Sequence, residues 1–80
     1  IAPAGQSLVF EYVDAPGRVG TIGTILGEAG INITTMQIVN DPEAGQAIVY
    51  MNIEGELDDS VLAKLRENLE DLKNLWYVKL

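Results

Sequence analysis

Two stretches of this chain repeat one apolar spacing, and that repeat narrows the folds open to the sequence. Apolar residues recur at steps of three, four and three within residues 19–29 and again within residues 62–72. Such steps place the side chains in one stripe along a helix that lies on a core. The stripes are Val19, Ile22, Leu26 and Ala29 in the first stretch and Leu62, Leu65, Leu69 and Leu72 in the second. We therefore predict two helices, over residues 18–29 and about 55–74.

Four segments around these helices have the patterns of strands. They are rich in alternating apolar, β-branched and aromatic residues. The segments are residues 7–13, 31–40, 46–54 and 75–80. In the second segment the apolar positions change parity near Thr34 and Thr35, which predicts a β-bulge. Asp14 and Pro16 suit the start of the first helix, and Asp58 or Asp59 is expected to cap the second.

The elements follow the order β-α-β-β-α-β, which consists of two similar halves. Right-handed crossovers place both helices on one face of a four-stranded antiparallel sheet. We predict an α+β fold, a ferredoxin-like βαββαβ sandwich with strand order 4-1-3-2 and the second and fourth strands at the edges. Residues 1–6 are expected to end a linker, and residues 7–80 to form one domain. Because the chain begins with Ile1 and not with Met, we expect it to be part of a longer protein.

Composition removes several classes of function. Five basic and twelve acidic side chains give a formal net charge of −7, and an acidic surface repels phosphates, so neither nucleic acid nor a membrane is an expected partner. The chain has no cysteine and no histidine, which removes disulfides, thiolate chemistry and the usual zinc sites and fits a cytoplasmic location. No serine or threonine has a base nearby in the sequence, so we expect no catalytic residue and no metal site.

The turn before the first helix and the start of the second strand carry a candidate site for a small zwitterion. Asp14 would hold an ammonium group, the first N–H groups of the helix a carboxylate, and Asn32 would supply a neutral hydrogen bond. Tyr12 lies two residues from Asp14 and points to the same side. The residues alone leave ordinary roles open: Asp14 as a helix cap, Asn32 as a loop residue, Tyr12 as core. Arg18 on its own is most simply a solvated side chain.

The stretch from Val13 to Ile33, VDAPGRVGTIGTILGEAGINI, resembles the motif of ACT domains, in which a D-x-P-G turn and a helix lead to G-[IV]-N-I. The resemblance extends from Ser7 to Leu80. It implies a regulatory module that binds an amino acid between paired domains and controls an attached enzyme. Within the family the chain is most similar to the C-terminal regulatory domains of bacterial D-3-phosphoglycerate dehydrogenases, which implies L-serine, or another small amino acid, as ligand and NAD only in the missing catalytic part. There are two alternatives. The domain could belong to an iron–sulfur L-serine dehydratase, or it could be a dimerising module with a vestigial site.

The resemblance also implies which residues meet the ligand and which meet a second copy. The implied ligand contacts are Tyr12, Asp14, Pro16, Gly17, Arg18, Val19, Asn32 and Ile33. The implied homodimer joins the second strand and the first helix of two copies through Gly20, Gly23, Gly27, Thr34, Met36, Ile38 and Asn40. The three glycines fall within about 60° on the helix wheel, and two explanations stay open for them: close approach of a partner backbone, or close packing on the domain's own sheet. The rim from Asn32 to Asn40 carries no Lys or Pro that would block pairing.

Overall fold

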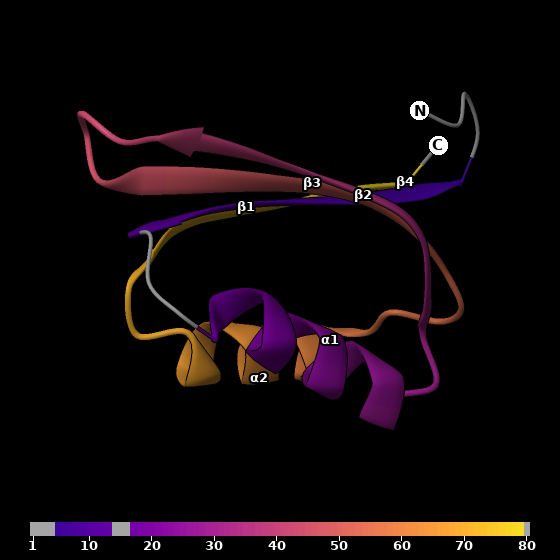
Figure 1. The fold of residues 1–80 in the computed structure, drawn as a ribbon. Helices are drawn as coiled ribbons and strands as arrows, with labels where there is room; N and C mark the ends of the chain where they lie inside the picture. Colours follow the sequence, from indigo (N-terminus) through magenta and orange to yellow (C-terminus); the bar gives the residue numbers. More distant parts are fainter. Residues whose placement is uncertain (1–4, 14–16, 80) are drawn as a thin grey trace.

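The structure is a computed structural model that describes residues 5–13 and 17–79. It contains a single sheet covered on one side by two helices (Figure 1). The elements are β1 (Gln6–Val13), α1 (Arg18–Glu28), β2 (Asn32–Asp41), β3 (Gln46–Glu54), α2 (Asp59–Asn68) and β4 (Leu72–Lys79). Neighbouring strands pair antiparallel in the order β2-β3-β1-β4, which confirms the predicted fold and leaves β2 and β4 at the edges. None of the helices described has the length and apolar character needed to cross a membrane.

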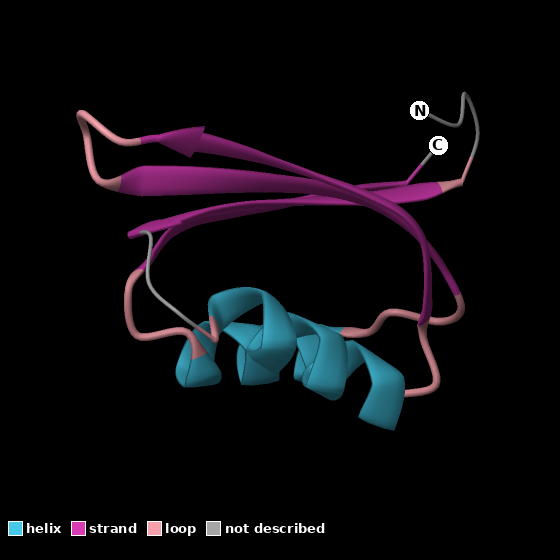
Figure 2. Ribbon diagram, viewed as in Figure 1, coloured by secondary structure: helices cyan, strands magenta, loops and turns pink. Residues whose placement is uncertain are grey.

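The core lies between the helices and one face of the sheet (Figure 2). Alternate residues of β1 and β3 point into it, because successive side chains of a strand face opposite ways. The expected stripes are confirmed for six residues, which belong to the core or pack against it: Val19, Ile22, Leu26, Leu62, Leu65 and Leu69. Ala29 is instead exposed just after α1, and Ile25, which that spacing omits, is 6% exposed and belongs to the core. The largest fully buried side chains are Phe10, Leu8, Ile22, Leu26, Leu65, Leu69 and Val49. The opposite face of the sheet has no layer over it among the described residues.

Two local features of the fold bear on the sequence-based expectations. The register of β2 against β3 shifts between Ile33 and Thr35, which confirms the bulge. The predicted extent of the second helix is wrong: α2 ends at Asn68, and Leu72 already belongs to β4. The physical reason is strand pairing, since Leu72 lies opposite Tyr12 of β1. Leu72 thus continues the leucine spacing of the helix but forms the first residue of the edge strand β4.

Candidate functional site

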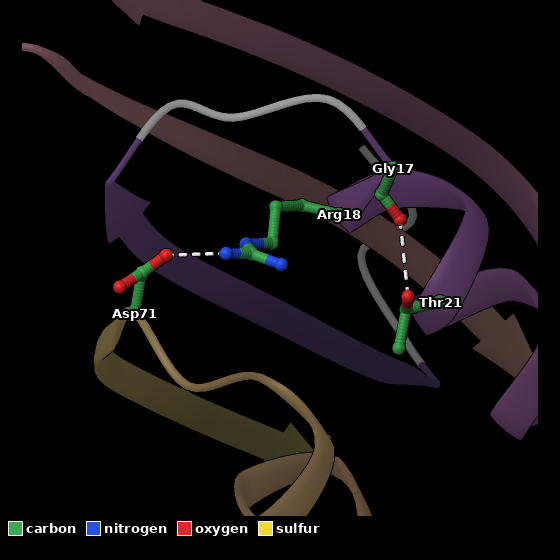
Figure 3. Close-up of polar contacts among 4 residues, drawn as sticks. All are labelled: Gly17, Arg18, Thr21 and Asp71. Carbon is green, nitrogen blue, oxygen red and sulfur yellow. Dashed lines mark hydrogen bonds and ion pairs between the residues drawn. The ribbon is translucent and has the colours of Figure 1, made fainter.

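The turn that leads from β1 into α1 is the centre of the predicted site. Asp14 and Pro16 lie outside the described residues. The structure therefore describes this turn only through Val13 before it and the residues from Gly17 onward after it. Gly17 is the N-cap of α1 and has a φ of 86°, a left-handed conformation that side chains disfavour and glycine adopts readily. Its carbonyl oxygen accepts hydrogen bonds from the backbone N and from Oγ1 of Thr21, each at 3.0 Å (Figure 3). These two bonds hold the start of α1, and no side chain in the described part of the chain caps it.

One residue from the far end of the chain holds both flanks of this turn. The Asp71 carboxylate forms an ion pair with the Arg18 guanidinium (Figure 3), and the Asp71 carbonyl accepts a hydrogen bond of 3.2 Å from the Val13 N–H. Asp71 lies in the loop between α2 and β4. The turn is therefore anchored on both sides by a residue that the sequence analysis missed.

Arg18 differs from its expected solvated state. Its side chain is only 24% exposed, and its buried Nε has no hydrogen-bond partner among residues 5–13 and 17–79. The guanidinium charge is compensated by Asp71, 53 residues away in sequence. Arg18 therefore fastens the first turn of α1 to the α2–β4 loop, and its pairing leaves less positive charge for an incoming anion.

The N-terminus of α1 is the candidate place for a carboxylate. No described side chain caps this helix, and its first turn contains no acidic residue. Exposed first-turn N–H groups and the helix dipole favour a bound anion. Val19, also predicted in the site, is partly buried against the core in this first turn.

The remaining predicted ligand contacts are spread along the domain. Tyr12 is 2% exposed and belongs to the core, while Ile33 packs against that core from β2. Asn32 is exposed at the start of β2, beyond the C-terminal end of α1 (Figure 1). Because α1 has 11 residues, about 16 Å of helix separates Asn32 from Gly17. A single chain does not bring these two residues together.

The predicted interface residues lie on accessible surface. Thr34 and Asn40 are exposed, and the Thr34 hydroxyl donates to the Asn52 carbonyl across the bulge. Met36 and Ile38 are on the helix-side face of β2, opposite the buried Met51 and Val49, yet they are 46% and 45% exposed. The helices do not reach far enough to cover this edge of the sheet.

The space around the glycines of α1 bears on one of their two explanations. Beyond the backbone of the helix itself, a Cβ added at Gly20, Gly23 or Gly27 would meet no described atom within 4 Å. Close packing on the domain's own sheet is therefore wrong as the reason for these glycines. Their contact with a partner backbone stays a prediction.

Comparisons with known proteins identify the family. The model of the ACT domain matches residues 6–71. The chain belongs to the ACT domain family. Its relatives include the D-3-phosphoglycerate dehydrogenase of Mycobacterium leprae, 36% identical over 75 residues, and that of Bacillus subtilis, 31% identical over 78 residues. These matches cover 89% and 98% of this chain.

The same comparisons show how this ACT domain relates to whole proteins. The chain spans only 14% and 15% of the two dehydrogenases named above. Among solved structures, a formyltetrahydrofolate deformylase from Pseudomonas putida matches 94% of this chain and 28% of its own, with a TM-score of 0.80 and 17% identity. At that identity the likeness concerns the fold alone. The match places the same fold inside a larger protein.

Proposed function

We propose that this chain is an amino-acid-binding regulatory domain that acts as a homodimer, with L-serine as its ligand and a D-3-phosphoglycerate dehydrogenase as the controlled enzyme. The relatives support the choice of enzyme, since each is a D-3-phosphoglycerate dehydrogenase many times longer than the matched segment. The proposal assigns no cofactor to these 80 residues. NAD would bind to the catalytic part of such an enzyme.

The observation that carries a two-chain site is the separation of Gly17 from Asn32 along α1. Val13 and Asp41 both pair with Gln46, so the turn after β1 and the end of β2 share one end of the sheet. Asn32 pairs with Glu54 at the other end. If two β2 strands pair antiparallel, the two-fold axis carries Asn32 of one copy to the end of the sheet where the other copy has Gly17.

The surface beside β2 supports this pairing. The partner would cover the half-exposed side chains of Met36 and Ile38 on the helix-side face of β2. Removal of this apolar area from water would stabilise the dimer. The glycine side of α1 has room for the partner's helix, because outside that helix no described atom lies within 4 Å of a Cβ placed at Gly20, Gly23 or Gly27. β2 is an edge strand with no charged side chain between Asn32 and Asn40, and unprotected edges of this kind pair readily.

In the proposed complex each group of serine has a counterpart. Its carboxylate would lie at the N-terminus of α1, where backbone N–H groups and the helix dipole favour a negative charge. Its ammonium group would contact the carboxylate of Asp14. Asn32 of the second copy would hydrogen-bond the hydroxyl group and select for it. Arg18 would act by holding the turn against Asp71.

Calorimetry with L-serine and D-serine tests the proposal. We expect saturable heat with one L-serine bound per chain, and at least about tenfold weaker binding of the enantiomer, because inverting the α-carbon misplaces one of three groups. Serine should also tighten the dimer in sedimentation experiments, since a ligand that binds only the paired form stabilises it. No heat with L-serine at millimolar concentration would overturn the proposed ligand.

A dimerising module with a vestigial site is the second candidate, and one observation favours it. Arg18, the cationic residue in the first turn of α1, is already paired with Asp71. A module of this kind would sediment as a dimer whose stability is unchanged by any of the small amino acids. The same pair of experiments therefore separates the two functions.

A further inference from the structure

The helices leave one face of the sheet open (Figure 2), and the middle of this face carries exposed apolar side chains. The register of the strands identifies the side chains on it, because they alternate with the buried ones. One row across all four strands consists of Gln37, Tyr50, Val9 and Trp76, and the next consists of Thr35, Asn52, Ser7 and Val78. We call these two rows the open-face centre. Tyr50, Trp76 and Val78 in it are 41%, 48% and 47% exposed, and contiguous apolar patches of this kind mark interaction sites.

Three polar side chains in one row of the open-face centre, Ser7, Asn52 and Thr35, hydrogen-bond to one another. Asn52 is only 7% exposed although no layer covers it. Its Oδ1 accepts a hydrogen bond of 2.9 Å from the Ser7 hydroxyl, and its Nδ2 donates one of 2.7 Å to Oγ1 of Thr35. Covering this row would therefore cost few hydrogen bonds to water, and unsatisfied polar groups are the main penalty of a dry contact.

Charge is confined to the margins of this face. The open-face centre has no ionisable side chain except the Tyr50 phenol, although the whole chain has a net charge of −7. Glu11, Asp41 and Glu54 belong to the same face but lie outside the two central rows. Glu11 is engaged with Asn74 of β4, whose Nδ2 donates to its carboxylate at 2.6 Å. The centre is thus neutral enough to meet an identical surface.

The size of the face reaches the lower end of what a stable contact needs. The strands run along the length of the molecule (Figure 1), whose longest dimension is 34 Å, and four strands about 4.8 Å apart span about 15 Å between the outer two. With its side chains the open face offers on the order of 600 Å², so two stacked copies would bury about 1,200 Å² in total, the lower end of the range of standard protein interfaces.

We propose that two copies of this chain stack through their open faces, with the row from Tyr50 to Trp76 at the centre of the contact. A two-fold axis near Val9 places the aromatic rings of one copy against the central row of the other, a self-complementary arrangement. This contact is separate from the pairing of β2 edges and needs no ligand. Where both contacts form, two edge-paired dimers stack into an assembly of four chains.

Trp76, the only tryptophan of the chain, reports this contact directly. As the 80-residue chain is concentrated from micromolar to millimolar, we expect the Trp76 emission to shift to the blue and its quenching by acrylamide to fall. Added salt should strengthen the association, because it screens the repulsion between the acidic margins and between two chains of like net charge. Tyr50→Asp should weaken the association by at least about a hundredfold, because each pair of chains would bury two carboxylates.

Matched variants separate the two contacts. Ile38→Asp, on the helix-side face of β2, should halve the largest mass in sedimentation equilibrium and leave the Trp76 shift in place. Tyr50→Asp should also halve that mass, but it should abolish the Trp76 shift. The double variant Ile38→Asp/Tyr50→Asp should be monomeric. The conservative variant Tyr50→Phe should behave like the wild type in both measurements. Circular dichroism checks folding, and Val78→Asp replaces Tyr50→Asp if that variant is unfolded.

Three results would overturn the proposed stacking. The first is a Trp76 emission that stays that of a solvent-exposed indole at millimolar concentration in high salt. The second is an association that weakens with salt, which indicates a contact between opposite charges. The third is burial of Trp76 only when the 80 residues are joined to a catalytic part, which assigns the open face to another domain.

Discussion

The two helices of this domain begin in different ways. At α2 the Asp58 carboxylate caps the helix by accepting hydrogen bonds from the Val61 N–H at 3.1 Å and from the Ser60 hydroxyl at 2.6 Å. At α1 the N-cap is Gly17, and no described side chain performs this task. The two halves of the fold are otherwise alike in order and spacing. The start of α2 is thus capped by a neighbouring side chain, whereas Asp71 from the α2–β4 loop holds the start of α1, where no described side chain binds the first-turn N–H groups.

The largest expected effect comes from changing Gly17, because its left-handed conformation orients the whole start of α1. Gly17→Val should cost about 1–2 kcal/mol of stability and weaken L-serine binding by about a hundredfold or more. Gly45→Val is the matched control, since Gly45 also has a positive φ, of 66°, and open space around a Cβ. Both variants should lose similar stability in urea unfolding, and only Gly17→Val should lose affinity in calorimetry. Equal affinities in the two variants would contradict a site at α1.

Asp14 provides the next largest effect on binding. Asp14→Ala removes the charge proposed to meet the ammonium group, and loss of a charge-assisted hydrogen bond costs about 1.5–3 kcal/mol, or roughly tenfold to a hundredfold in affinity. Asp59→Ala makes the same charge change in the first turn of α2. We expect calorimetry to show wild-type affinity for Asp59→Ala. A wild-type affinity of Asp14→Ala would remove Asp14 from the site.

A smaller effect is expected from Asp71, which holds the turn without meeting the ligand. Asp71→Asn breaks the ion pair with Arg18 but keeps the backbone hydrogen bond to Val13. We expect a loss of about 0.5–1 kcal/mol in stability, as for a partly exposed ion pair, and a several-fold loss of serine affinity. Glu28→Gln is the control, because it breaks a longer and more exposed pair with Lys64, 3.7 Å apart. If Asp71→Asn binds serine more tightly, then Arg18 is a ligand contact that Asp71 blocks.

The smallest effect on serine binding is expected from Asp58, which caps the N-terminus of α2. Hydrogen bonds from the Ser60 hydroxyl and the Val61 N–H lower the pKa of Asp58 below its ordinary 3.8. A lowered folded-state pKa means that the cap stabilises the fold at neutral pH, and that this stability is lost as the pH falls through the folded-state value. Asp58→Ala should therefore unfold at lower urea concentration than the wild type at pH 7, and the gap should narrow below pH 3.8. Asp58→Asn keeps the cap without its titration, and serine affinity should be unchanged in both.

Local patterns in the sequence were sufficient for most of the fold. Apolar spacing located both helices, and the change of parity near Thr34 and Thr35 located the bulge. The cap of α2 was narrowed to Asp58 or Asp59, because capping depends on residues two and three positions away, and the structure shows that it is Asp58. The end of α2 was predicted wrongly, since Leu72 fits a helical stripe and a strand equally well and pairing with β1 decides between them. The contact of Asp71 with Arg18 was missed because it joins residues with no local relation.

The candidate site was predictable only in part. The residues of the turn and Asn32 follow from the motif, but their separation along α1 depends on the three-dimensional course of the chain. The same holds for the glycines, whose empty surroundings appear only when the neighbouring atoms are placed. The open face was also missed, because Trp76 and Tyr50 are distant in sequence and become neighbours of Val9 only through the strand register.

Mixing two inactive variants tests the shared site most directly. At a serine concentration just high enough to fill most wild-type sites, Asp14→Ala and Asn32→Ala should each leave nearly all of their sites empty. If each site takes Asp14 from one copy and Asn32 from the other, a mixed dimer of the two variants contains one intact site, so an equimolar mixture should recover about a quarter of the wild-type capacity in calorimetry. No recovery, in a mixture shown to exchange subunits, would mean that the site lies within one chain and would contradict the account.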